Sequence, residues 1–266
     1  MSSAVEQHVI YQIANAPLRE YPYPHLYVES VFPEAYYRSI RRYWPGSSSL
    51  VSLAKTGRVI AGLYAERFVM PFTLPEVDKL PQEQRDFWHD FHSWFMGEHF
   101  LRVLLDKFGP YVRKRFGAAI SRYDFSVDSL IVRDHVNYNL GPHTDAPQKL
   151  FSLLFYCPDD DTGRHLGTSI YTPIDPKFRC PGTAHHQRDM FNKVKTMDYR
   201  PNSLFAFFKT DNSFHGVEPL TDQGVLRDLL LYDVRAHGRT EAATASGEPR
   251  IGWRILRNLF GSISGR

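Results

Sequence analysis

The sequence predicts a mainly β domain with flanking helices, in which the strands form an antiparallel sandwich or barrel. Aromatic residues, which favour strands, make up 14% of the 266 residues. Short apolar runs at 150–156, 204–208 and 225–234 are separated by Gly, Pro and Asp turns, a pattern typical of antiparallel sheets. Only residues 81–116 show a long stretch of helical periodicity instead.

The composition is that of a globular protein. Hydrophobic residues make up 42% and charged residues 23%, which excludes a mostly disordered chain. The 32 Lys and Arg exceed the 29 Asp and Glu by three, a surplus too small to indicate nucleic acid as a partner. The two cysteines, Cys157 and Cys180, cannot form a disulfide framework and favour a reducing compartment. Neither a signal peptide nor an apolar run of about 18 residues is apparent, so we expect a cytoplasmic protein.

The N-terminal part is expected to form a helical layer. Residues 25–32 read as one extended piece, and residues 34–43 as a short helix after Pro33. In the region 81–116, aromatic and aliphatic residues recur at helical spacing, and Gly97 and the Gly109-Pro110 pair divide it into two or three helices. We interpret this aromatic stripe as core packing against one face of a sheet.

From residue 120 the periodicity changes to two. Residues 123–127 and 129–133 both read as extended, and the three apolar runs follow. Between them, residues 158–202 are polar, with a strand signal only at 168–171, and a loop of that length is usually functional or mobile. The sequence therefore predicts one domain over residues 1–236, with its β core at about 120–236.

Residues 237–266 are expected to form a linker and a basic amphipathic tail. If the tail is helical, its arginines lie on one face and its aliphatic residues on the other. Such a helix either contacts an anionic membrane peripherally or docks on its own domain or on a second subunit. The sequence does not predict an oligomeric state.

The strongest chemical signal is His143-Thr144-Asp145, followed much later in the chain by His215. On an extended segment His143 and Asp145 point to the same side, so their side chains can reach one ion. His215 follows the 204–208 strand and can supply a third ligand from a neighbouring strand. Two His and one carboxylate on one face of an ion form the arrangement of non-haem Fe(II) oxygenases.

Two basic residues extend this candidate site. Arg227 lies shortly beyond His215, at the start of an apolar strand, where it can pair with a substrate carboxylate inside a barrel or, alternatively, form a surface salt bridge. Lys149, shortly after the H-x-D, is a candidate substrate contact.

The order of these residues resembles the 2-oxoglutarate- and Fe(II)-dependent dioxygenases, which have H-x-D, a distant H, and an arginine a short distance after that histidine. Tyr138 and Gly141 resemble the Y-x-x-G lead-in of that family. Residues 166–171 resemble its G-G-x-L-x-Y strand, and residues 215–219 are similar to its H-G-V-x-P segment. The resemblance covers about residues 121–235.

The resemblance implies a double-stranded β-helix, or jelly roll, that packs against the N-terminal helices. It implies that His143, Asp145 and His215 bind Fe(II), and that Arg227 and Tyr138 bind the co-substrate 2-oxoglutarate, with O₂ as the second co-substrate. The implied reaction is hydroxylation of an unactivated C–H bond of a small molecule, such as an amino acid, a sugar or a natural-product intermediate, with release of succinate and CO₂. Because Asp145 retains the carboxylate, halogenation is not expected.

Several alternatives stay open on the sequence alone. The same chemistry can act on a protein or peptide side chain, and a jelly roll can bind a metal or sugar without catalysis. A nucleic-acid demethylase is disfavoured, because the next arginine after Arg227 is Arg235, eight residues on.

The loop 158–202 contains several histidines, Cys180 and a group of basic residues. Its histidines and Cys180 match no zinc spacing, so a second metal site is not expected there. The basic residues of the loop either line the mouth of the active site, which suits an anionic substrate, or are simply solvated. The candidate basic residues of the rim are Arg164, Lys177, Arg179, His185, His186 and Arg188.

Overall fold

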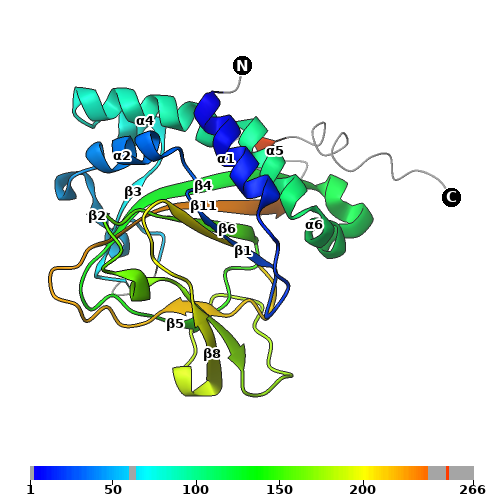
Figure 1. Ribbon diagram of the computed structural model, residues 1–266. Helices are drawn as coiled ribbons and strands as arrows, with labels where there is room; N and C mark the ends of the chain where they lie inside the picture. The colour runs from blue at the N-terminus through cyan, green and yellow to red at the C-terminus, as the bar shows by residue number, and fades with distance from the viewer. Residues whose placement is uncertain (1–2, 60–63, 239–249, 252–266) are drawn as a thin grey trace.

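The computed structural model describes residues 3–59 and 64–238, and the backbone of 250–251. Two antiparallel sheets form its centre (Figure 1). The larger sheet consists of β1 (His25–Glu29), β2 (Val51–Ser52), β3 (Arg67–Pro71), β4 (Tyr123–Asp134), β6 (Lys149–Tyr156), β9 (Ser203–Phe208), β11 (Arg227–Gly238) and β12 (Arg250–Ile251). The smaller sheet consists of β5 (Leu140–His143), β7 (Ser169–Pro173), β8 (Phe191–Thr196) and β10 (His215–Val217).

The strands from β4 to β11 are distributed between the two sheets. Within the larger sheet their order is β9-β6-β11-β4, and in the smaller sheet it is β5-β10-β7-β8. Each neighbouring pair is antiparallel. This is the topology of a double-stranded β-helix, so the predicted jelly roll with flanking helices is confirmed.

Most of the helices lie across the outer face of the larger sheet (Figure 1). The helices are α1 (Ala4–Asn15), α2 (Glu34–Arg42), α3 (Leu74–Val77), α4 (Gln82–Phe95), α5 (Glu98–Lys107) and α6 (Gly109–Phe116). Phe95 of α4 packs against Phe155 and Tyr232 of the sheet, with ring centroids 5.4 and 4.9 Å apart. The aromatic stripe predicted over residues 81–116 therefore forms the core between helices and sheet, as expected.

The two faces of β11 serve different purposes because successive side chains alternate across a sheet. Leu230, Tyr232 and Val234 face the helices and are buried in that core. The alternate residues, among them Arg227, Leu231 and Arg235, line a cavity between the two sheets. One strand thus contributes both to the hydrophobic core and to the cavity.

The structure differs from the sequence prediction in two segments. Residues 158–202 contain strand β8 in addition to β7, although β8 is largely exposed and polar. Helix α1 begins at a capping residue, since the Ser3 hydroxyl accepts a hydrogen bond from the Glu6 amide at 3.1 Å. We did not predict this helix, because the Pro and Tyr content of the N-terminal segment masked its helical signal.

The predicted tail, residues 237–266, lies largely outside the described residues. Its described part comprises the end of β11 and the two residues of β12, which pair with Ser126 and Phe125 of β4. None of the helices in the described ranges combines the length and apolar composition that a membrane span requires.

Candidate active site

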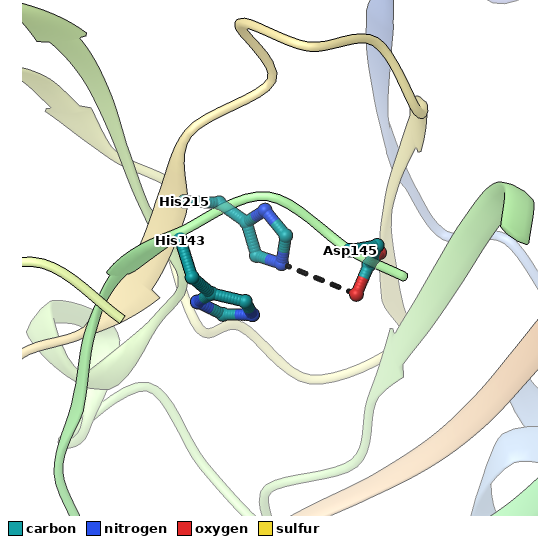
Figure 2. A group of neighbouring side chains, drawn as sticks. All are labelled: His143, Asp145 and His215. Atoms are coloured by element: carbon teal, nitrogen blue, oxygen red, sulfur yellow. Dashed lines mark ion pairs between the residues drawn. The ribbon is translucent and has the colours of Figure 1, made fainter. Parts of the chain in front are cut away.

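His143, Asp145 and His215 converge at one end of the smaller sheet. His143 is the last residue of β5, Asp145 follows two residues later, and His215 opens β10. His143 and His215 are direct partners in the β5–β10 ladder. One potential ligand atom from each of the three side chains lies within 4.8 Å of the others, and His215 Nε2 is 3.9 Å from Asp145 Oδ1 (Figure 2). The predicted triad is therefore assembled from segments that lie far apart in the sequence.

Both imidazoles are oriented by backbone carbonyls. The Nδ1 of His143 lies 3.0 Å from the Gly141 carbonyl, and the Nδ1 of His215 lies 2.9 Å from the Ser213 carbonyl. A carbonyl only accepts, so each Nδ1 carries the proton and donates it. The lone pair of each ring is then on Nε2, the atom that faces the common point of the triad.

Burial keeps both imidazoles neutral. Burial lowers the pKa of His143 well below its usual value, and the neighbouring His215 lowers it further. Burial likewise lowers the pKa of His215, although Asp145 partly opposes this. A neutral imidazole is the form that binds a metal, so the site holds its histidines ready for a cation.

Gly216 allows the two strands to approach closely beside His215. A Cβ at this position would lie 2.4 Å from the Leu140 carbonyl oxygen of β5. The β5–β10 register also shifts between His215 and Val217. The glycine of the His-Gly-Val segment thus permits the close strand contact that places His215 beside His143.

The Asp145 carboxylate is held from two sides. Ser152 donates a hydrogen bond to Oδ2 at 3.0 Å, and Lys149 Nζ lies 3.1 Å from Oδ1. Burial alone would raise the pKa of Asp145, but Lys149 and then the two histidines lower it below its usual range. The ligand carboxylate is therefore ionised and fixed in orientation.

Lys149 contacts Asp145 because of a bulge in β6. The ladder between β6 and β11 skips one residue, so that Arg235 pairs with Lys149 and Val234 pairs with Phe151. A bulge changes the face to which a side chain points. Lys149 consequently lines the cavity with Ser152, and its Nζ also lies 2.7 Å from Asp233. The predicted candidate contact lies inside the cavity, where it bridges two carboxylates.

Arg227 is fully buried and lines the same cavity as the triad. Its Nη1 donates to Asp134 Oδ2 at 2.7 Å, its Nε donates to the Leu166 carbonyl at 2.6 Å, and its Nη2 lies 3.3 Å from the Thr168 hydroxyl. It is not part of a surface salt bridge, which was the alternative interpretation of this arginine.

A second arginine, Arg67 of β3, lies beside Arg227. It binds Asp134 through both carboxylate oxygens, at 2.6 and 2.9 Å, so one fully buried carboxylate is shared by two guanidinium groups. The three side chains carry a net positive charge. Arg67 and Asp134 could not be predicted from the sequence, because Arg67 lies far before Arg227 in the chain and outside any motif. The pairing of β3 and β11 with the same β4 residue brings them together.

Tyr138 lies behind Arg67. The Arg67 guanidinium is 4.4 Å from the centre of the Tyr138 ring, and the described residues that line the cavity do not include Tyr138. Its buried hydroxyl has no hydrogen-bond partner among the described residues. Among the described residues, Tyr138 is therefore connected to the cavity through the Arg67 guanidinium and does not line it directly.

The cavity that contains the triad and Arg227 has a volume of about 210 Å³. Its middle is apolar and its ends are charged. Leu231 lies between Arg227 and Arg235 on β11 and pairs with Leu130 and Leu154, and the other apolar residues of the lining include Leu53, Phe207 and Val217. A larger hollow of about 650 Å³ lies elsewhere, beside Tyr111 and Lys209, and contains none of the triad.

The basic residues of the 158–202 loop do not line this cavity. Arg164 pairs with Asp198, and Arg179 donates to the carbonyls of residues 176 and 178. Arg188 donates to the Val217 carbonyl at 2.8 Å and lies 3.4 Å from Glu218. The basic residues that line the cavity come from other segments and are Arg58, Arg67, Lys149, Arg227 and Arg235.

His185 of the loop lies beside the triad. Its ring centroid is 4.8 Å from that of His143, and its Nε2 is hydrogen-bonded to the Tyr64 hydroxyl at 2.8 Å. His165 pairs with Asp222 at 3.0 Å instead of joining it. Among the described residues, the only group of three or more potential metal ligands is His143, Asp145 and His215.

No protein-family model and no curated protein matches the sequence. Similar solved structures include the non-heme alpha-ketoglutarate-dependent carbocyclase SnoK from nogalamycin biosynthesis, which is 12% identical, with a TM-score of 0.48 and 91% of each chain covered. A prolyl 4-hydroxylase from Pseudomonas putida is 12% identical, with a TM-score of 0.47, over 86% of this chain and 98% of its own. A 2OG-Fe(II) oxygenase family oxidoreductase from Burkholderia pseudomallei is 12% identical, with a TM-score of 0.41, over 92% of this chain and 96% of its own. Similarities this low do not transfer a reaction or a substrate.

Proposed function

We propose that this protein is an Fe(II)- and 2-oxoglutarate-dependent oxygenase that hydroxylates a C–H bond of a small molecule. The observation that carries the proposal is one cavity with two different ends. Two Nε2 atoms and a carboxylate converge at one side, and the buried Arg227 lies at another. A dicarboxylate that chelates a metal through its keto acid has its second carboxylate free to pair with such an arginine.

His143, Asp145 and His215 are the proposed metal ligands. Two neutral imidazoles and one ionised carboxylate match the donor set of non-haem Fe(II) sites, which leaves further coordination positions open. When bound, the iron supplies the redox chemistry that activates O₂. The protein holds the three ligands in place through Ser152, Lys149 and the two backbone carbonyls.

Arg227 is the proposed partner of the distal carboxylate of 2-oxoglutarate, with Arg67 beside it. Because Asp134 neutralises only one of the two guanidinium groups, the pair has one positive charge left for a ligand carboxylate. Tyr138, which the resemblance assigned to the co-substrate, does not line the cavity, and its proposed role is to position Arg67, whose guanidinium lies 4.4 Å from its ring centre.

A small substrate is favoured over a peptide segment. The cavity, at about 210 Å³, is below the usual range of about 300–1,000 Å³ for drug-sized ligands, and it also has to hold the co-substrate. A non-catalytic jelly roll is disfavoured by the pairing around Arg227, because Arg67 and Arg227 share the single carboxylate of Asp134 and keep a positive charge in the metal cavity for a ligand carboxylate.

The proposal is tested by binding and turnover. Purified protein in anaerobic equilibrium dialysis is expected to bind one Fe(II) per chain. Calorimetry on this loaded protein is expected to show binding of 2-oxoglutarate, and succinate is expected to form when O₂ is admitted. His143→Ala should abolish metal binding. Arg227→Met should retain metal binding but weaken 2-oxoglutarate binding about tenfold to a hundredfold, as expected for loss of a charge-assisted hydrogen-bonded pair.

His165→Ala is the matched control, because it removes an exposed histidine outside the triad. It should leave both binding steps unchanged. The proposal is wrong if the protein binds no metal, or if His143→Ala and His165→Ala bind it equally well.

A further inference from the structure

The cavity has a second charged end, formed by Arg58, Asp128, Lys149, Asp233 and Arg235. The Arg58 guanidinium binds both oxygens of Asp128 at 2.9 and 2.8 Å, and Arg235 Nη2 lies 3.3 Å from Asp128 Oδ2. Lys149 Nζ lies 2.7 Å from Asp233. Neither Arg58 nor Arg235 has a role in the proposed metal site or in the proposed co-substrate site.

This end is opposite to Arg227 along β11. The cavity-facing residues of β11 begin at Arg227 and end at Arg235, eight residues later. Leu231 lies between them and pairs with Leu130 of β4. Asp233 pairs across the ladder with Asp128, so the strands bring two carboxylates together and surround them with cations. An apolar middle therefore separates the charged cluster from the co-substrate end.

The charges of the cavity do not balance. Among the described residues, those that line it carry five fixed positive charges, on Arg58, Arg67, Lys149, Arg227 and Arg235. Four carboxylates oppose them, namely Asp128, Asp145 and Asp233 in the lining and Asp134 behind the two arginines. A divalent metal and a doubly charged 2-oxoglutarate cancel each other, so the loaded cavity keeps one positive charge in excess. A cavity with a surplus of one sign of charge attracts a counter-ion, and the Arg58 and Arg235 side chains, 36% and 25% exposed, leave this end open to one.

Arg235 is the cation best placed to receive that counter-ion. Lys149 is enclosed between Asp145 and Asp233, and Arg58 binds Asp128 with two short hydrogen bonds. Among the described residues, Arg235 makes only the single 3.3 Å contact with Asp128, and its side chain is 25% exposed. Its guanidinium therefore has donors left for a ligand, and its planar fork suits an oxyanion.

We propose that the substrate of this oxygenase carries one singly charged oxyanion, a carboxylate or a sulfate, which binds Arg235 with Arg58 beside it. This inference rests on the proposed function, because it takes the metal and 2-oxoglutarate as the other occupants of the cavity. It assigns the charged group of the substrate to the Arg235 end and the apolar part of the substrate to the leucine-lined middle.

The test uses two probes of equal shape, hexanoate and hexanamide, with hexylammonium as the opposite charge. The full chain is loaded with Ni(II), which does not support turnover, and saturated with 2-oxoglutarate so that the Arg227 end is filled. Binding is measured by calorimetry. Hexanoate is expected to bind at least about tenfold more tightly than hexanamide, since a charge-assisted hydrogen bond contributes more than a neutral one. Hexylsulfate is expected to share this preference.

Variants then show which residues cause the preference for hexanoate over hexanamide. Arg235→Gln should abolish the advantage of hexanoate over hexanamide, and Arg58→Gln should reduce it. Arg102→Gln, at an exposed position of α5 on the far side of the sheet, is the matched control and should leave it unchanged. Each variant is checked for 2-oxoglutarate binding, which should stay as in the parent protein.

The outcomes separate this inference from the proposed function. If Ni(II) or 2-oxoglutarate fails to bind the parent protein, the proposed function and this inference are both wrong. If both bind, this inference alone is overturned by any of three results: no preference for hexanoate, including no binding of any probe; a preference for hexylammonium; or a preference for hexanoate that Arg235→Gln leaves intact.

Discussion

Lys149 is the side chain that connects the metal site to the second charged end of the cavity. It lies between Asp145 and Asp233, at 3.1 and 2.7 Å, and both carboxylates are buried. Burial would lower the pKa of Lys149, but the charges of Asp145 and Asp233 and the hydrogen bond to Asp233 raise it above its usual value. The lysine thus stays charged at a depth where an unpaired ammonium would lose its proton.

Lys149→Met is expected to destabilise the metal-free protein by about 3–5 kcal/mol, because it leaves buried carboxylates without their cation. The double variant Lys149→Met/Asp233→Leu should recover a large part of this loss, since it removes one of the two uncompensated charges. Urea unfolding of the parent, the two single variants and the double variant completes the cycle. If the two single effects simply add, the charges do not interact as described.

The element that positions the site is the pair β5–β10, two strands of only four and three residues. Their close approach at Gly216 is the condition for the two histidines to face each other. The ligands would be misaligned by any group that separates these strands.

Gly216→Ala is therefore expected to weaken metal binding about tenfold to a hundredfold, the usual effect of disturbing the groups that orient metal ligands. The added Cβ would meet the Leu140 carbonyl at 2.4 Å and push the two strands apart. The far-UV circular dichroism spectrum should stay unchanged, because the larger sheet and the helices are not involved. Unchanged metal affinity, measured by equilibrium dialysis, would contradict this account.

The elements that could be predicted well from the sequence are those whose own residues show a clear hydrophobic pattern. The runs 204–208 and 225–234 are apolar because both faces of β9 and β11 are largely buried, and their existence could be predicted. In contrast, β8 has mostly exposed polar residues, and β5 consists of Leu-Gly-Pro-His, so pairing with neighbours rather than local preference defines them. Helix α1 has a local signal in the Ser3 to Glu6 spacing of a capping box, but the Pro and Tyr content of the segment that follows masks it.

The same distinction applies to the candidate site. His143, Asp145, His215 and Arg227 belong to a local motif order, and the structure brings all four to one cavity. Arg67 and Arg58 come from segments far from that motif, and only strand pairing and the chain path between β2 and β3 reveal them. The inward orientation of Lys149 depends on the β6 bulge, which no spacing rule predicts.

At the scale of the whole molecule, several buried histidines link stability to pH. Burial lowers the pKa of His25, although the Tyr23 carbonyl partly opposes this, and burial also lowers the pKa of His143 and His215. All three rings are therefore neutral in the folded protein at a pH where the unfolded chain already begins to take up protons, below about 6.5.

The unfolding free energy of the metal-free protein is consequently expected to have its full value above about pH 6.5 and to fall as the pH decreases towards 5. The slope is up to about 1.4 kcal/mol per pH unit for each histidine that stays neutral. Urea unfolding at a series of pH values measures it, and His25→Asn should make the slope shallower. A flat profile between pH 7 and 5 would show that these rings take up protons without unfolding.

The larger sheet separates two kinds of residue by the simple alternation of its strands. On β11, Leu230, Tyr232 and Val234 hold the helices, while Leu231 and Asp233 face the cavity. The substrate contacts of Leu231 and Arg235 can therefore be changed without repacking the helical layer, whereas Arg227 and Asp233 are bound to Asp134 and Lys149. A new substrate preference can thus be engineered by varying Leu231 and Arg235 one at a time, while the packing between the helices and the larger sheet stays unchanged.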